Sequence, residues 1–134
     1  MSRREGREAI FKTLFGMDLN PTLDLSTALQ TAKDEYKNFT DNDEEYALST
    51  IRGVNENLNA IDSLISSSSP DWKIERMAAV DKAILRLATF EMKFAEERLK
   101  PNIAINEAVE LAKKFGADDS SRFINGVLSG ILKK

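Results

Sequence analysis

The sequence predicts an all-α protein, and three observations carry this prediction. The 134 residues include only three prolines and six glycines, so few residues interrupt regular structure. Between these residues, apolar side chains recur at spacings of three and four, the period of one helix face. Hydrophobic residues make up 42% and charged residues 31% of the chain, as in ordinary folded domains. The length suits one domain, residues 1–134, with a single hydrophobic core.

The first helix is predicted to start after Ser2, because Ser2 and Glu5 have the S-x-x-E form of a capping box. Asn20-Pro21 is expected to end it. Its apolar stripe consists of Ile10, Phe11, Leu14, Phe15 and Met17.

Two more helices are expected in the next part of the chain. Residues 40–43 (Thr-Asp-Asn-Asp) separate them and offer N-cap side chains. The second helix is indicated by Leu25, Ala28, Leu29, Ala32 and Tyr36. The third is predicted as one seam of about five turns, formed by Ala47, Ile51, Val54, Leu58, Ile61 and Ile65.

Four serines before a proline, Ser66–Pro70, are typical of a mobile connector, here expected between two halves of the domain. A strongly apolar helix follows, and because it has few polar positions we expect it to be central. Its apolar residues are Val80, Ala83, Ile84, Leu87, Phe90 and Phe94.

The chain is expected to end in two helices. One runs from about Ile105 to Phe115, after a connector around Pro101, and Gly116 is predicted as its left-handed C-cap. Asp118 or Asp119 is expected to cap the last helix. Gly126 and Gly130 would let another helix approach closely. The core face of the last helix is Ile124, Val127, Leu128 and Ile131.

The composition also narrows the classes of function. The chain has no histidine and no cysteine, which removes the commonest general base, thiolate nucleophiles and the usual transition-metal ligands. No phosphate-binding glycine loop is present. We therefore expect neither an enzyme nor a cofactor. No apolar stretch approaches a membrane span or signal peptide, so a cytoplasmic protein is expected. The net charge of −3 requires any nucleic-acid binding to come from a local patch.

Several segments closely resemble the NusB family of transcription antitermination factors. The most specific are Ile105–Lys113, Phe115-Gly116 and Phe123–Leu128. Val80–Ala88 with Phe90-Glu91, and Gly53-Val54 with Asn57, Ile61-Asp62 and Ile65, agree in order and spacing. The start of the chain, with Arg3-Arg4, Arg7–Ala9 and Leu14-Phe15, resembles the arginine-rich first helix of the family.

The resemblance implies a bundle of about seven helices in two halves, and a function. Members of the family bind the boxA element of single-stranded RNA together with NusE, a ribosomal small-subunit protein. They help RNA polymerase to read through terminators, notably in ribosomal RNA operons. By this resemblance the chain is expected to join an RNA polymerase antitermination complex.

Arg3, Arg4 and Arg7 are the first candidate RNA ligands. Their spacing of three and four places them close together on a helix. From the residues alone a solvated, salt-bridged face is favoured, and the resemblance reverses this preference in favour of RNA. Arginine pairs with phosphate and stacks on unpaired bases. Phe15 stands where the family often has Tyr, so only packing or stacking is expected there.

A second candidate RNA surface surrounds Gly116 and the start of the last helix. Phosphate contact by basic residues and stacking on a phenylalanine would act together there, although Asp119 is equally suited to capping and Phe123 to the core. The residues are Lys113, Lys114, Asp119, Arg122 and Phe123.

Two residues, Arg76 and Asp81, are by the resemblance candidate contacts to NusE, and ordinary surface charges are the alternative. Arg86 and Glu91 interrupt the apolar central helix, and a structural ion pair or backbone hydrogen bonds are favoured for them. Asn57 is interpreted as a buried hydrogen-bonding residue. Trp72 is interpreted as a core anchor between the halves, with partner binding as the alternative.

Other readings of the sequence stay open. The chain could bind only protein, including a second copy of itself, and a homodimer could hide the arginines. An enzyme is the least favoured reading, because paired acidic residues such as Asp118-Asp119 are explained by capping.

Overall fold

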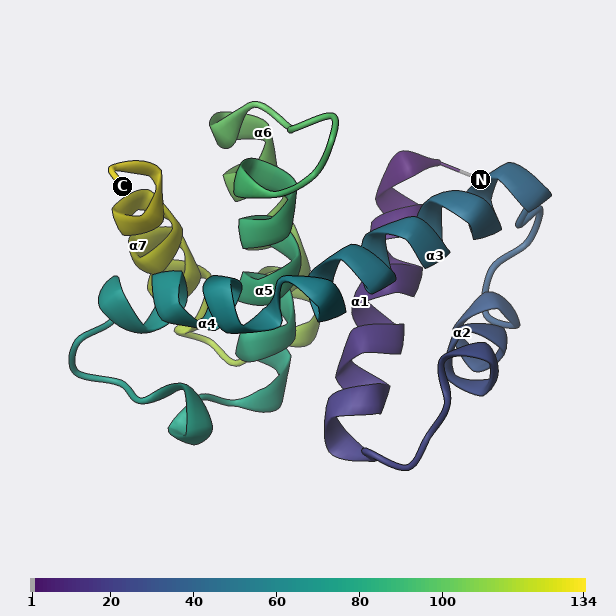
Figure 1. Cartoon of the computed structure of the whole chain (residues 1–134), viewed down its shortest axis with the longest axis horizontal. Coiled ribbons are helices and arrows are strands. Elements are labelled where there is room, and N and C mark those ends of the chain that lie inside the picture. Colours follow the sequence, from purple (N-terminus) through teal and green to yellow (C-terminus); the bar gives the residue numbers. More distant parts are fainter. Residues whose placement is uncertain (1) are drawn as a thin grey trace. The chain divides into compact units, whose positions relative to one another are not determined.

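The computed structural model describes residues 2–134, and within them the chain forms seven α-helices and one 3-10 turn (Figure 1). This confirms the predicted all-α class. Two compact units are present: the first ends at Arg52 and the second covers Gly53–Lys134. The helices are α1 (Arg3–Leu19), α2 (Leu25–Lys33), α3 (Asp41–Glu56), α4 (Leu58–Ser67), α5 (Ala79–Lys93), α6 (Pro101–Phe115) and α7 (Ser120–Leu132).

The first unit is built on the packing of α1 against α2. The predicted capping box at the start of α1 is present, since Ser2 Oγ accepts from the Glu5 amide and the Glu5 carboxylate accepts from the Ser2 amide. Helix α1 ends before Pro21, at Asn20, as expected. Helix α2 stops at Lys33, so Tyr36 lies in the following turn and not on the predicted helix.

The second unit has α5 at its centre, because α5 packs against α4, α6 and α7 (Figure 1). Helix α5 carries an almost unbroken run of buried side chains, and helix α7 supplies the core face predicted for it. These α7 residues are Ile124, Val127, Leu128 and Ile131.

The predicted third helix is in fact two helices, α3 and α4, separated at Asn57. The Asn57 side chain donates to the Gly53 carbonyl at 2.8 Å, in local competition with the helical ladder. Asn57 is half-buried, and its φ and ψ of −107° and 15° depart from helical values. The apolar seam nevertheless continues across the break, since Val54 and Ile61 are both fully buried.

The serine segment differs from the mobile connector that the sequence predicts. Ser69 is buried and its hydroxyl donates to the Ile65 carbonyl at 2.6 Å, which fixes this turn to the end of α4. The segment lies inside the second unit, whereas the division between the units falls at Arg52–Gly53, within α3.

At the glycines near the C-terminus, the absence of a side chain matters where neighbouring atoms lie close, and no left-handed backbone is involved. Gly116 has an extended conformation, with φ −93° and ψ −174°, so the predicted left-handed cap is wrong. A Cβ at Gly116 would lie 2.7 Å from Ser120 Cβ and 2.8 Å from the Ala112 carbonyl oxygen. Gly130 lies close to Ser68, but no described atom lies within 4 Å of a Cβ at Gly126, so only one of the two allows close packing.

Helix α6 starts earlier than predicted, with Pro101 in its first turn. Proline is suited to this position because the first helical amide has no partner within the helix. No helix within residues 2–134 is long and apolar enough to cross a membrane.

Candidate nucleic-acid interface

The three N-terminal arginines do not share one environment. Arg3 and Arg4, in the first turn of α1, are exposed, whereas Arg7 is only 3% exposed. Position 7 precedes Ile10 and Phe11 by three and four residues, and therefore lies on the apolar face of α1. The predicted patch therefore keeps Arg3 and Arg4 at the surface, whereas Arg7 lies in the interior.

Arg3 lies on an aromatic ring that the sequence analysis did not single out. Its guanidinium carbon is 4.4 Å from the centroid of the Tyr46 ring, at the start of α3. Asp43, one turn before Tyr46, has its pKa lowered mainly by the Thr40 amide that it accepts from, and the Arg3 charge adds to this effect. Tyr46 precedes the apolar seam, so periodicity marks it as peripheral and gives no sign of this contact.

A polar network holds α1 to the segment after α2. The Tyr36 hydroxyl donates to Glu8 Oε1 at 2.9 Å, and Lys12 pairs with Glu35 while lying 4.8 Å from the Tyr36 ring centroid. Burial raises the pKa of Tyr36. Burial alone would lower the pKa of Lys12, but its bonds to Glu35 and Tyr36 outweigh burial and raise it. The charges of this face are therefore largely compensated.

Phe15 is half-buried and stacks on Phe11, with ring centroids 5.9 Å apart. This geometry agrees with the packing expected of Phe15. A direct role for it in RNA binding stays a prediction.

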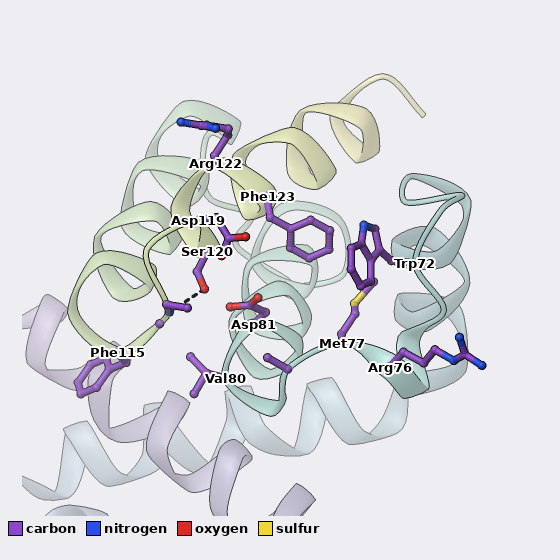
Figure 2. A pocket seen from close by; sticks show the side chains of 13 residues that line it. Trp72, Arg76, Met77, Val80, Asp81, Phe115, Asp119, Ser120, Arg122 and Phe123 are labelled. Carbon is purple, nitrogen blue, oxygen red and sulfur yellow. Dashed lines mark hydrogen bonds between the residues drawn. The ribbon is translucent and has the colours of Figure 1, made fainter.

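A hollow of about 600 Å³ lies in the second unit, between the chain around Trp72, the start of α5 and the start of α7 (Figure 2). It brings together residues that the sequence analysis assigned to two different ligands. Arg76 and Asp81, the candidate NusE contacts, line it along with three candidate RNA ligands, Asp119, Arg122 and Phe123. We call this cavity, lined by these five residues and Trp72 among others, the α5–α7 hollow.

Trp72 is 55% exposed, so its interpretation as a core anchor is wrong. It follows a turn in which its amide donates to the Ser69 carbonyl, and this turn carries the indole outward. The indole packs edge-to-face on Phe123, with ring centroids 6.2 Å apart and an interplanar angle of 73°. The two rings form the apolar wall of the α5–α7 hollow.

Asp81 is the chemically unusual group of the hollow. Its Oδ1 is buried and has no hydrogen-bond partner among residues 2–134. Burial raises the pKa of Asp81 and the Asp119 charge adds to the rise, while the Ser120 hydroxyl opposes it. A buried oxygen of this kind is costly for the folded protein.

Asp119 occupies the N-cap position of α7, but its side chain makes no capping hydrogen bond to the described residues. Its φ of −98° and ψ of 0° also differ from the extended backbone that is typical of a capping residue. Ser120 bonds locally instead, its hydroxyl accepting from the Ala117 amide at 2.9 Å. The predicted capping role of Asp119 is therefore wrong, and its carboxylate lines the hollow.

The remaining candidate RNA residues, Lys113 and Lys114, are exposed on the last turn of α6. Lys113 lies 3.8 Å from the Glu110 carboxylate, and Lys114 Nζ lies 5.5 Å from the Phe115 ring centroid. They flank the sequence around Gly116, but they are not among the residues that line the hollow.

Arg86 forms the structural ion pair that the sequence favours. Its Nε and Nη2 donate to the two carboxylate oxygens of Asp62 at 2.9 and 3.0 Å. Such a bidentate pair joins α4 to α5. Glu91 is buried on the same helix.

Known proteins are similar to this chain over nearly its whole length. The NusB family model matches residues 4–133. A protein of Bdellovibrio bacteriovorus named transcription antitermination protein NusB is 44% identical over 135 residues, covering 98% of this chain and 96% of that protein. A protein of the same name from Agathobacter rectalis is 43% identical over 129 residues, covering 96% and 98%.

Two solved structures are similar over nearly the whole chain. NusB of T. maritima superimposes with a TM-score of 0.90 at 39% identity, covering all of this chain and 92% of that one. A chain from a crystal structure of the antitermination factors NusB and NusE in complex with double-stranded RNA superimposes with a TM-score of 0.85 at 27% identity, covering 98% and 96%.

Proposed function

Because this chain belongs to the NusB family, we propose that it is an antitermination factor that binds boxA-type single-stranded RNA together with NusE. Bound in this way, it promotes read-through of terminators by RNA polymerase, notably in ribosomal RNA operons. The observation that carries the proposal is the pair of exposed arginines in the first turn of a family-typical first helix.

The arginines suit RNA for a physical reason. Arg3 and Arg4 place two planar cations in the first turn of α1, where cations oppose the helix dipole by about 0.3–1 kcal/mol each. The capping Glu5 offsets part of this cost within the protein. A phosphate would offset more of it, so an anionic strand is the natural ligand of this turn.

The α5–α7 hollow suits two ligands at neighbouring points. Arg122 and Phe123 offer phosphate contact and an aromatic surface for a base, which fits RNA. Arg76 and Asp81 offer a cation and a carboxylate, which fit a protein surface of complementary charge. We therefore assign the first pair to RNA and the second pair to NusE. A solved assembly of NusB and NusE with double-stranded RNA supports the two kinds of ligand, RNA and NusE.

The proposal is tested by transcription in a bacterial extract depleted of its own NusB. The template carries a boxA element upstream of a terminator, and a matched template carries a scrambled boxA. Adding this protein is expected to restore read-through on the boxA template alone, as re-adding the extract's own NusB does. Equal read-through on both templates, or none where the extract's own NusB is active, would contradict the proposal.

A further inference from the structure

The contact between Arg3 and Tyr46 joins two helices of the first unit at the surface. Arg3 is the first residue of α1, and Tyr46 lies in the second turn of α3. The guanidinium carbon lies 4.4 Å from the ring centroid, well within the range of a cation–π interaction. The Tyr46 ring lies against the guanidinium, and Arg3 as a whole stays exposed to solvent.

Tyr46 does not pack in the hydrophobic core. The apolar seam of α3 passes through its neighbour Ala47, which is fully buried, whereas Tyr46 is half-buried. A half-buried ring below an exposed arginine orders a side chain that otherwise has four rotatable bonds and wide freedom. The contact therefore fixes the position of a cation that the chain presents to solvent.

Asp43 places a carboxylate near this cation. It lies three residues before Tyr46 on the same helix face, and after its bonds to Thr40 the Arg3 charge also contributes to the lowered pKa of its carboxylate. A phosphate at Arg3 would lie near this negative charge, whereas an arginine plane can also stack on an unpaired base.

We propose that Tyr46 is a positioning residue for RNA: it holds the Arg3 guanidinium as a platform on which one unpaired base of the bound strand stacks. The order of the stack is Tyr46 ring, Arg3 guanidinium, base. This inference rests on the proposed RNA-binding function and adds to it the residue that orders Arg3 and the part of the strand that Arg3 receives.

The experiment compares Tyr46→Phe, Tyr46→Leu, Arg3→Ala and the double variant Arg3→Ala/Tyr46→Leu in titrations with a labelled boxA-like single-stranded RNA. Tyr46→Phe keeps the ring and is expected to bind as wild type does. Tyr46→Leu is expected to weaken binding about tenfold, the scale of one lost base stack. The double variant is expected to bind no more weakly than Arg3→Ala. Thermal unfolding verifies that each variant is folded.

The salt dependence separates stacking from phosphate contact. Loss of a phosphate ligand lowers the log–log slope for single strands by about 0.7. We expect Tyr46→Leu to leave the slope unchanged, and Arg4→Ala, the matched control, to lower it. Replacing one nucleotide of the RNA after another with an abasic site is expected to reveal one position at which Tyr46→Leu has no further effect.

Three results would overturn the inference alone: wild-type affinity in Tyr46→Leu, equal losses in the Phe and Leu variants, or additive losses in the double variant. Wild-type protein that binds boxA-like and scrambled RNA equally weakly would overturn the proposed function, and the inference with it.

Discussion

The α1 face of the first unit and the α5–α7 hollow of the second unit handle their charged residues in opposite ways. On the α1 face, Glu8 accepts a hydrogen bond from Tyr36 and Lys12 pairs with Glu35. In the second unit, the α5–α7 hollow keeps the buried Asp81 Oδ1 without a partner among the described residues, near the carboxylate of Asp119.

This difference distinguishes residues that stabilise the fold, as on α1, from residues suited to binding a ligand, as in the α5–α7 hollow. A matched network contributes to folding, so its loss should lower stability. A buried carboxylate oxygen without a donor costs stability, and a protein can retain such a cost at a site that serves binding.

The shape of the α5–α7 hollow depends on the close approach at Gly116. In Gly116→Ala, the new Cβ would meet a backbone oxygen at 2.8 Å, so backbone must shift, and we expect a loss of about 2–3 kcal/mol in the free energy of unfolding. Gly126→Ala is the control, because its Cβ meets open space in a helix interior and should stabilise by about 0.5–1 kcal/mol. Urea unfolding measures both, and equal effects would contradict this account of Gly116.

The Arg86–Asp62 pair is the matched charge of the second unit. Their side chains are 16% and 24% exposed. Arg86→Ala leaves a mostly buried carboxylate without its bidentate partner, and we expect a loss of about 2 kcal/mol. Arg122→Ala, on the exposed rim of the hollow, should change stability by less than about 0.5 kcal/mol while weakening RNA binding. A stable Arg86→Ala protein would show that the pair is dispensable.

The Tyr36 hydroxyl is the matched polar group of the first unit. Tyr36→Phe removes the donor to Glu8, which is itself buried, and should cost about 1 kcal/mol of unfolding free energy. Tyr46→Phe is the control and should be close to neutral, because the ring on which Arg3 lies is retained. Denaturant midpoints that shift equally in both variants would remove the distinction.

Asp81→Asn should have the smallest effect, and in the opposite direction. The folded-state pKa of Asp81 is raised, chiefly by burial, so the folded protein binds the proton more tightly than the unfolded chain does. Its contribution is therefore most favourable below the unfolded pKa of about 3.9 and is lost as the pH rises through the folded pKa. At neutral pH we expect Asp81→Asn to raise Tm by about 1–3 °C.

The gain from Asp81→Asn should vanish near pH 3.5, below the unfolded pKa. A melting temperature that is lowered at neutral pH would mean that the Asp81 carboxylate is already satisfied in the free protein. NusE binding, followed by calorimetry, should weaken in this variant if the carboxylate receives a donor from NusE.

Periodicity predicted the helices well, because packing of one apolar face decides them. It could not reveal the break at Asn57, since the seam of Val54 and Ile61 continues across it. Trp72 was misplaced for a related reason: its hydrophobicity indicates burial, but the turn at Ser69 carries it to the surface. Side-chain geometry decides such cases, and spacing does not encode it.

The sequence indicated candidate residues for the site, but it predicted only part of their arrangement in space. The spacing that grouped Arg7 with Arg3 and Arg4 also placed it on the apolar face, and its burial follows from that face. The hollow that gathers Asp81 with Asp119 and Phe123 joins distant segments, which no local pattern indicates. The contact of Arg3 with Tyr46 was missed for the same reason.

The most direct test of the central claim is a titration of labelled boxA-like single-stranded RNA with this protein, with and without NusE. Scrambled RNA, Arg3→Ala/Arg4→Ala and the exposed control Arg52→Ala complete the set. We predict weak, boxA-preferring binding that NusE strengthens, with a log–log salt slope of about −2 to −3.5. The double variant should lose about 0.7 of that slope, the share of the one phosphate contact made by Arg4, and Arg52→Ala should not. A slope near zero, or equal binding of scrambled RNA with NusE present, would contradict the account.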